Sequence, residues 1–208
     1  MPAAAHTIFL LSPANLSGER AKMVLNPRAA FAAAHALHSA AGSPIGEVFS
    51  FVSGLYFRGK AVYSARFARP PEPDTSALEI SAGDGLIPLA ESITADRLRR
   101  WADVEISERN PDFTEPLIRD AEALERAYGA STRFVLLGSV ASDKYVRPLT
   151  RVFGDHLLFP TDFVGRGDMS RGALMLRAAR AAVELSYEPV ETAVRRGRRA
   201  PRIGGASS

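Results

Sequence analysis

The stretch LLFPTDFVGRGDMSRGALMLR, residues 157–177, contains the three local patterns that decide the fold. It opens with an apolar run, residues 157–159, that is typical of a short buried strand. A polar turn with two glycines, Gly165 and Gly167, comes next, and a long apolar helical pattern follows it. The stretch therefore predicts a strand, a loop and the start of a helix.

The loop inside this stretch carries opposite charges close together. Ordering charged groups costs hydration unless they bind a ligand or one another. Arg166 and Arg171 are forked donors suited to phosphate or carboxylate, and a helix that begins near Ser170 adds free N–H groups beside Gly167. Asp168 would cap the helix, pair with an arginine or act as an acid/base group. We predict an anion site here; a capped helix with a surface ion pair is the alternative.

Outward from this stretch, apolar runs alternate with helical patterns. The predicted strands are residues 7–12, 78–81, 133–138 and 157–159, with an edge strand at 187–190. The predicted helices are residues 27–41, 94–104, 115–128, 143–153 and 171–185. The aromatic spacing of residues 48–67 also favours a helix, despite the glycines there. Residues 14–27 are predicted to form a loop. Such alternation predicts an α/β fold: a single domain with a mostly parallel central sheet flanked by helices.

Composition supports one domain and excludes several classes of protein. The chain has 208 residues, 46% of them hydrophobic and 24% charged, which is ordinary globular usage. The absence of cysteine excludes disulfides and thiol catalysis and fits a cytoplasmic protein. No apolar run is long enough for a membrane span, and the first residues lack the basic region of a signal peptide. Residues 1–194 are the expected domain, and 195–208, with five arginines, the expected disordered basic tail.

Each of four polar clusters comes directly after a predicted strand, at residues 12–15, 81–85, 139–145 and 161–171. In a mostly parallel sheet, ligands bind outside the carboxyl ends of the strands, so we expect these four loops to converge at one rim. Besides the residues of the last loop, the candidate ligand-binding side chains are Ser12, Asn15, Ser81, Ser139 and Ser142.

Candidate acid/base groups lie on three of these loops. Lys144 would contact phosphate or act as a base, and Tyr145 would stack on a ligand or donate a proton; the alternative is a helix start capped by Asp143. Asp84, between two glycines, lies in a tight turn or orients a base or a sugar. With Asp168, these residues form the catalytic candidates. No P-loop, dinucleotide fingerprint or serine-hydrolase elbow is present, and we expect no metal and no cofactor.

Several segments together resemble the YaaA family of peroxide-stress proteins. FLLSPAN (9–15) is similar to that family's opening strand and Ser-Pro-Ala turn, and ISAGDGLIP (80–88) to its Leu-Ser-Gly-Leu-Tyr-Gly-Val-Leu-Arg-Pro segment. VASDKY (140–145) is close to Leu-Ala-Ser-Asp-Glu-Tyr, and RGDMSR (166–171) to Arg-Gly-Leu-Met-Ser-Arg. The chain differs at Asn15, where the family has lysine, at Lys144, where it has glutamate, and at the additional Asp168. The resemblance implies an α/β protein of the oxidative-stress response that binds DNA.

Two hypotheses about function follow. In the first, the protein binds DNA in stress response or DNA protection, with Arg166, Lys144, Arg171 and the basic tail meeting phosphates. In the second, it is an enzyme whose rim holds a phosphate-bearing, nucleotide-like or other anionic small molecule, with Asp168, Lys144 and Tyr145 as acid/base groups. Neither hypothesis requires a membrane, and the sequence leaves the oligomeric state open.

Overall fold

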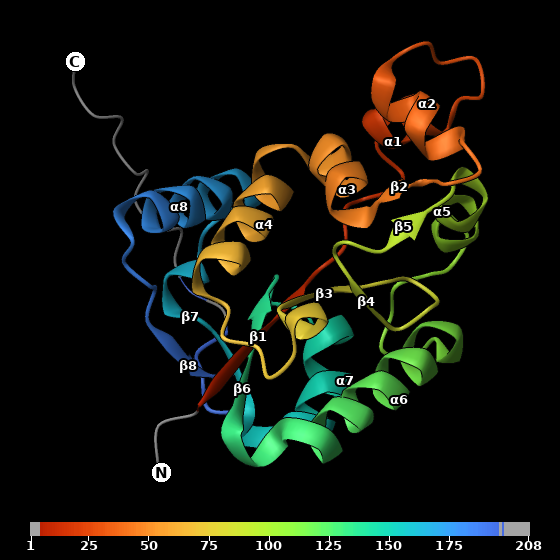
Figure 1. Cartoon of the computed structure of the whole chain (residues 1–208). Helices are drawn as coiled ribbons and strands as arrows, with labels where there is room; N and C mark the ends of the chain where they lie inside the picture. Colours follow the sequence, from red (N-terminus) through yellow and green to blue (C-terminus); the bar gives the residue numbers. More distant parts are fainter. Residues whose placement is uncertain (1–4, 196, 198–208) are drawn as a thin grey trace, which may run out of the picture.

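The computed structural model describes residues 5–195 and 197 as one α/β unit around a six-stranded sheet (Figure 1). The strand order is β4-β3-β1-β6-β7-β8. The inner strands β3 (Ala77–Ile80), β1 (His6–Leu11), β6 (Thr132–Leu137) and β7 (Leu157–Pro160) are parallel. The edge strands β4 (Leu86–Pro88) and β8 (Tyr187–Pro189) are antiparallel to their neighbours. The predicted fold class is confirmed.

Helices cover both faces of the sheet (Figure 1). On one face α4 (Leu55–Phe67) packs against α8 (Asp168–Ala181), and on the other α6 (Pro111–Tyr128) packs against α7 (Asp143–Phe153). The remaining helices are α1 (Glu19–Leu25), α2 (Ala32–His38), α3 (Ile45–Ser53) and α5 (Ala95–Ala102), near a small sheet of β2 (Ser43–Pro44) and β5 (Ser92–Ile93). Short 3-10 turns occupy Pro73–Thr75, Gly129–Ser131, Gly154–His156 and Thr161–Phe163.

The predicted strands are all present to within one residue at each end. Because the inner parallel strands are covered by helices on both faces, their side chains form continuous apolar runs, and residues 8–11 and 134–137 are fully buried. No helix among the described residues is long and apolar enough to cross a membrane.

One loop prediction and the bounds of several predicted helices were wrong. Residues 14–27, predicted as a loop, contain α1, which buries Ala21 and Val24 at helical spacing despite a polar opposite face. The helix predicted from residue 27 begins only at Ala32. The last helix begins at Asp168 rather than residue 171 and ends at Ala181, before a left-handed Ala182. Residues 48–67 are helical as favoured, but in two helices, because Gly54 takes a φ of 59° between α3 and α4.

Helices α4 and α8 cross with their backbones in contact at two glycines. A Cβ on Gly59 would lie 2.7 Å from the carbonyl oxygen of Gly172, and a Cβ on Gly172 would lie 2.7 Å from that of Leu55. Any side chain at either position would separate the helices. The close crossing brings Tyr56 and Lys60 of α4 near the first turns of α8.

The direction of winding changes between β1 and β6. The chain leaves β1 for β3 through α4, whereas it leaves β6 for β7 through α7 on the opposite face. At this switch point the connections diverge and leave a crevice at the carboxyl ends of the strands. Ser12 follows β1 there, and Ser139 follows Gly138 after β6. A Cβ on Gly138 would lie 2.9 Å from Ser12 Cβ, so the two strand ends approach closely.

The basic tail lies mostly outside the described residues, so its predicted disorder stays a prediction. Arg195, at its start, is described, and its Nη1 lies 2.7 Å from Asp143 Oδ1 at the beginning of α7. The chain therefore packs back against α7 at this point.

Candidate functional site

A cavity of about 670 Å³ lies at the carboxyl ends of β1 and β6, at the switch point. All four polar loops contribute to it, so they converge as expected. Beyond these loops, residues around α3, α4 and α5 complete the wall. The lining residues are Ser12, Pro13, Ala14, Asn15, Leu16, Ser17, Phe49, Ser53, Tyr56, Ala82, Trp101, Ala102, Val104, Glu105, Ile106, Ser139, Lys144, Tyr145 and Asp168.

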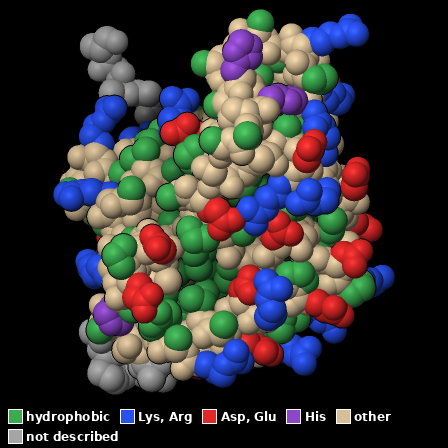
Figure 2. Space-filling view, turned by 45° about the vertical axis from the view of Figure 1, so that its right-hand side comes forward, with side chains coloured by type: hydrophobic (Ala, Val, Ile, Leu, Met, Phe, Trp, Pro, Cys, Tyr) green, Lys and Arg blue, Asp and Glu red, His purple; other side chains and the backbone are tan. Residues whose placement is uncertain are grey.

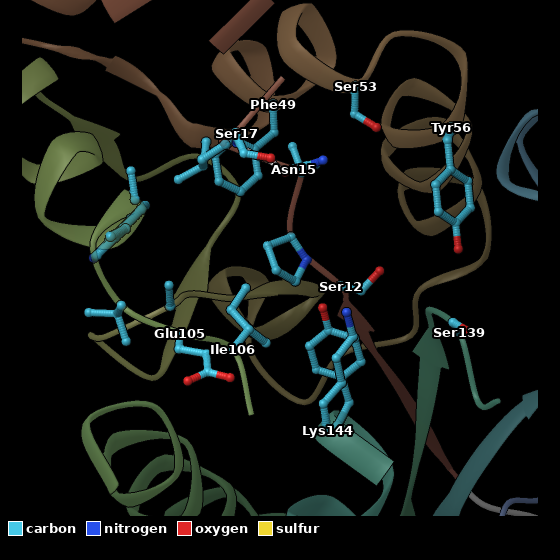
Figure 3. A pocket seen from close by; sticks show the side chains of 18 of the residues that line it. Ser12, Asn15, Ser17, Phe49, Ser53, Tyr56, Glu105, Ile106, Ser139 and Lys144 are labelled. Atoms are coloured by element: carbon cyan, nitrogen blue, oxygen red, sulfur yellow. Dashed lines mark hydrogen bonds between the residues drawn. The ribbon is translucent and has the colours of Figure 1, made fainter. Parts of the chain in front are cut away.

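The cavity has both aromatic and polar walls (Figure 3). Phe49 and Trp101 meet edge to face with ring centroids 6.5 Å apart, and the rings of Tyr56 and Tyr145 also line the space. Lys144 extends from the start of α7, where its ammonium lies 4.9 Å from the centroid of the Tyr145 ring. Flat aromatic surfaces beside hydrogen-bonding groups are typical of sites for small molecules with a planar ring.

Ser12 is held from behind by a buried lysine. Lys60 of α4 is only 1% exposed, and its Nζ donates to the Ser12 carbonyl oxygen over 2.6 Å and to Ser12 Oγ over 2.8 Å. The same ammonium lies 4.2 Å from the centroid of the Tyr56 ring. Burial lowers the pKa of Lys60 to about 8, against the opposing effect of Glu79. Roughly a tenth of Lys60 is therefore the neutral amine at about pH 7.

Glu79 on β3 is the acidic counterpart of Lys60. Its carboxylate is fully buried, and neither oxygen accepts a hydrogen bond from any part of the chain that the structure describes. Burial raises the pKa of Glu79 well above its ordinary value, and the positive charge of Lys60 opposes this rise. Since an unsatisfied buried carboxylate is costly, its presence behind a cavity calls for an explanation beyond packing.

Two buried phenols line the cavity near these groups. Burial raises the pKa of Tyr56 to about 12, with Arg171 opposing, and burial also raises the pKa of Tyr145. Both hydroxyls therefore stay protonated at neutral pH and are able to donate a hydrogen bond. Tyr56 Oη is buried and has no hydrogen-bond partner within residues 5–195 and 197. Arg171 and Ser12 nevertheless lie close enough to this hydroxyl to oppose the rise in its pKa.

Asp168 lines the cavity from the first turn of α8. Its side chain is 69% exposed, and one of its oxygens lies 3.5 Å from Nη1 of Arg171. The carboxylate therefore sits at the open mouth, where water screens it. Asn15 also lines the cavity, and its Oδ1 accepts hydrogen bonds from the backbone and hydroxyl of Ser17 over 3.0 and 2.7 Å.

The two arginines of the RGDMSR motif tie the loop together instead of lining the cavity. Arg171 is 7% exposed and donates from Nε and Nη2 to the Phe163 carbonyl oxygen, each over 3.2 Å. Arg166 donates from Nε to the Asp162 carbonyl oxygen over 2.8 Å. Gly167 is the N-cap residue of α8, and Ser170 Oγ lies 3.4 Å from Arg166 Nη1. These four predicted ligand-binding residues are thus not among those that line the cavity.

Three further candidates also lie outside the cavity lining. Asp84 accepts a hydrogen bond from Nε of Arg97 over 2.7 Å, and its backbone N–H donates to Ser81 Oγ over 2.8 Å. Ser142 stands at the N-cap of α7 and is exposed. In contrast, Ser12, Asn15, Ser139, Lys144, Tyr145 and Asp168 are all brought to one wall.

Sequence reasoning missed Lys60, Glu79, Tyr56, Phe49 and Trp101. The first two carried a signal: Glu79 is a charge inside the apolar strand ALEI, and Lys60 stands among the aromatics of 48–67. A charged residue within an apolar run is either at a strand edge or paired in the interior. The aromatic residues gave no such signal, because helix packing explains their spacing equally well.

Comparison with protein-family models, curated proteins and solved structures found no match to this chain. Within the described part of the chain, no group of three or more histidine or acidic side chains is arranged to hold a metal ion. The resemblance to the YaaA family therefore stays a hypothesis, and the function has to be argued from the cavity.

Proposed function

We propose that the cavity at the ends of β1 and β6 binds a small molecule with a planar ring and a polar or anionic group, and that the protein is an enzyme acting on this molecule. The main observation in support is that buried titratable groups lie directly behind a cavity with aromatic side chains in its wall. Lys60 and Glu79 both have perturbed pKa values, which are characteristic of functional sites.

The volume of the cavity supports a small ligand. Pockets of about 300–1,000 Å³ hold drug-sized molecules and cofactors, and about 670 Å³ falls in this range. A wall that contains Phe49, Tyr56 and Trp101 suits a ring such as a nucleobase, and Lys144 would meet an anionic substituent. Ser12, Ser139 and Asn15 supply the hydrogen-bonding groups that fix the orientation of a ligand.

DNA binding in stress response, the expectation from the resemblance, is the competing proposal. It requires basic side chains spread over an extended surface. On the face drawn in Figure 2, Lys and Arg side chains instead alternate with Asp and Glu side chains. Arg166 and Arg171, the cations expected to meet phosphates, bond to backbone carbonyls of their own loop. The small-molecule proposal is therefore the better supported of the two.

Calorimetric titration with nucleosides, nucleoside monophosphates and a short duplex DNA tests the proposal. We expect at least one nucleoside monophosphate to bind with a Kd below about 1 mM. Lys144→Gln should weaken monophosphate binding by about 3–10-fold and leave nucleoside binding unchanged. Arg66→Gln, which removes a cation from α4 at a separate hollow beside α8, is the matched control. Salt-sensitive duplex binding with no binding of the monomeric compounds would overturn the proposal in favour of DNA.

A further inference from the structure

Ser12 is the cavity-lining residue whose hydroxyl contacts the buried lysine. Its hydroxyl lines the cavity, while Lys60 lies behind it with Nζ 2.8 Å from Ser12 Oγ. We propose that Ser12 is a nucleophile and Lys60 its general base, which makes the cavity a site of acyl transfer from an ester or amide group of its ligand. This inference rests on the proposed small-molecule cavity and names the reaction carried out there.

The geometry has the two features that an activated serine needs. Ser12 Oγ and Lys60 Nζ lie within the hydrogen-bond range of about 2.6–3.2 Å that proton transfer requires, and the hydroxyl has only to turn from its long 3.4 Å hydrogen bond to the Leu137 carbonyl oxygen. The base is also fixed in place, because Nζ makes a second hydrogen bond to the Ser12 carbonyl oxygen and lies over the Tyr56 ring. Since Lys60 is 1% exposed and is not among the residues that line the cavity, a ligand would meet the Ser12 hydroxyl first, with the amine directly behind it.

The other serines of the cavity wall lack this arrangement. Ser17 donates to Asn15 Oδ1, and Ser139 Oγ accepts a long hydrogen bond of 3.4 Å from the Ala141 backbone. Of the serines lining the cavity, only Ser12 has a described lysine nitrogen within hydrogen-bond distance. The proposal therefore concerns a single hydroxyl.

Lys60 is able to act as a base near neutral pH. A lysine of ordinary pKa is almost wholly protonated there and cannot accept a proton. Burial lowers the pKa of Lys60 to about 8, so that roughly a tenth of it is neutral at about pH 7. Glu79 opposes this lowering, and the balance of the two effects keeps Lys60 in the range useful for general base catalysis.

In the proposed step, neutral Lys60 takes the hydroxyl proton as Ser12 Oγ bonds to the carbonyl carbon of the ligand. The carbonyl π pair moves to oxygen and forms an oxyanion. The protonated Tyr56 hydroxyl, buried close to Ser12, donates to this oxygen. The bond to the leaving group then breaks, and the leaving group takes the proton from Lys60. Water, deprotonated by Lys60, hydrolyses the acyl-Ser12 ester and returns the hydroxyl.

The charges on the wall favour an acyl group over a phosphoryl group. Among the described residues that line it, Lys144 is the only cation, and Glu105 and Asp168 are acidic. A tetrahedral acyl intermediate carries one developing charge, which a single donor and a nearby cation can stabilise. A phosphoryl transition state spreads charge over three oxygens and needs several cations.

Labelling of the full-length protein with a fluorophosphonate tests the proposal. In this reaction Ser12 Oγ bonds to phosphorus, the P–F bond breaks, fluoride leaves and the hydroxyl proton passes to Lys60. Peptide mapping should find the adduct on Ser12, and the rate should rise with pH through a midpoint of about 8. Lys60→Met and Lys60→Arg should each slow labelling by about 100-fold or more. Lys22→Met, which removes an exposed lysine of α1, is the control.

The results of labelling and of ligand titration distinguish a failure of the Ser12–Lys60 pair from a failure of the small-molecule cavity. Labelling of another serine, or equal rates in the wild type and both Lys60 variants, would overturn the Ser12–Lys60 pair. If a Lys60 variant fails to fold, the pH profile of the wild type still decides, because a rate without a midpoint near pH 8 contradicts a lysine base. Nucleoside monophosphate binding without labelling overturns the nucleophile alone. Labelling of Ser12 without such binding supports the nucleophile and removes only the nucleotide-like ligand.

Discussion

Lys60 Nζ lies 2.8 Å from Ser12 Oγ and 2.6 Å from the Ser12 carbonyl oxygen, and it thereby joins helix α4 to the carboxyl end of β1. The contact couples two properties of the protein. It fixes the residue that stands at the switch point of the sheet, and it places a charge in the interior, where hydration is lost.

Lys60→Met should change the pH dependence of stability. The pKa of Lys60 is about 8 in the folded protein and close to 10.5 in the unfolded chain. Below about pH 8 both states hold the proton, and the folded state bears a cost of up to about 3 kcal/mol. Between these pKa values the unfolded chain binds more protons, so the wild-type free energy of unfolding rises with pH. The methionine variant lacks this rise.

Urea unfolding of both proteins from about pH 7 to about pH 10 measures the effect. Relative to the wild type, Lys60→Met should be most stable at the lower pH values and lose this advantage as the pH rises. Parallel curves for the two proteins would mean that Lys60 keeps an ordinary pKa in the fold.

Glu79→Gln should move the midpoint of fluorophosphonate labelling to lower pH. The negative charge of Glu79 favours protonated Lys60, and the amide lacks that charge. The measurement is the labelling rate as a function of pH, with Glu19→Gln at an exposed ion pair of α1 as control. An unchanged midpoint in Glu79→Gln would show that the buried carboxylate does not act on the lysine.

Gly59→Ala and Gly172→Ala should each destabilise the fold by about 1–3 kcal/mol. The added Cβ at either position would lie 2.7 Å from a carbonyl oxygen of the opposing helix, so α4 and α8 would have to separate. Gly167→Ala is the control, since a Cβ there meets nothing within 4 Å. Chemical unfolding of the three variants compares them. Equal stability of all three would contradict the tight helix crossing.

The elements of the sheet could be predicted because each depends on its own residues. Strands buried on both faces, such as Leu136 in β6, appear in the sequence as apolar runs, and the polar loops follow them directly. The convergence of the loops followed from the parallel topology. Helix α1 was missed because only Ala21 and Val24 mark its buried face, and seven residues give too little periodicity to separate a helix from a loop.

The chemistry of the site could not be predicted because it depends on contacts distant in the sequence. Lys60 and Ser12 are 48 residues apart, and the pairing arises only when α4 crosses β1. The arginines of RGDMSR show that residue type alone can suggest a role that the folded structure does not bear out. Arg171 has the residue type of an anion ligand, yet the fold turns its guanidinium toward the Phe163 carbonyl oxygen eight residues earlier. The residue type of Arg171 indicated anion binding, but in the folded protein this side chain holds its own loop together.

The fluorescence of Trp101, the single tryptophan of the chain, tests the cavity most directly. Trp101 is 2% exposed and forms part of the cavity wall, so a ring that binds in the cavity should change the surroundings of the indole and its emission. We predict a saturable change on titration with a nucleoside monophosphate, reduced in affinity by Phe49→Ala and unaffected by Arg66→Gln. Unchanged emission across nucleosides and their monophosphates, together with salt-sensitive binding of duplex DNA, would contradict the small-molecule site.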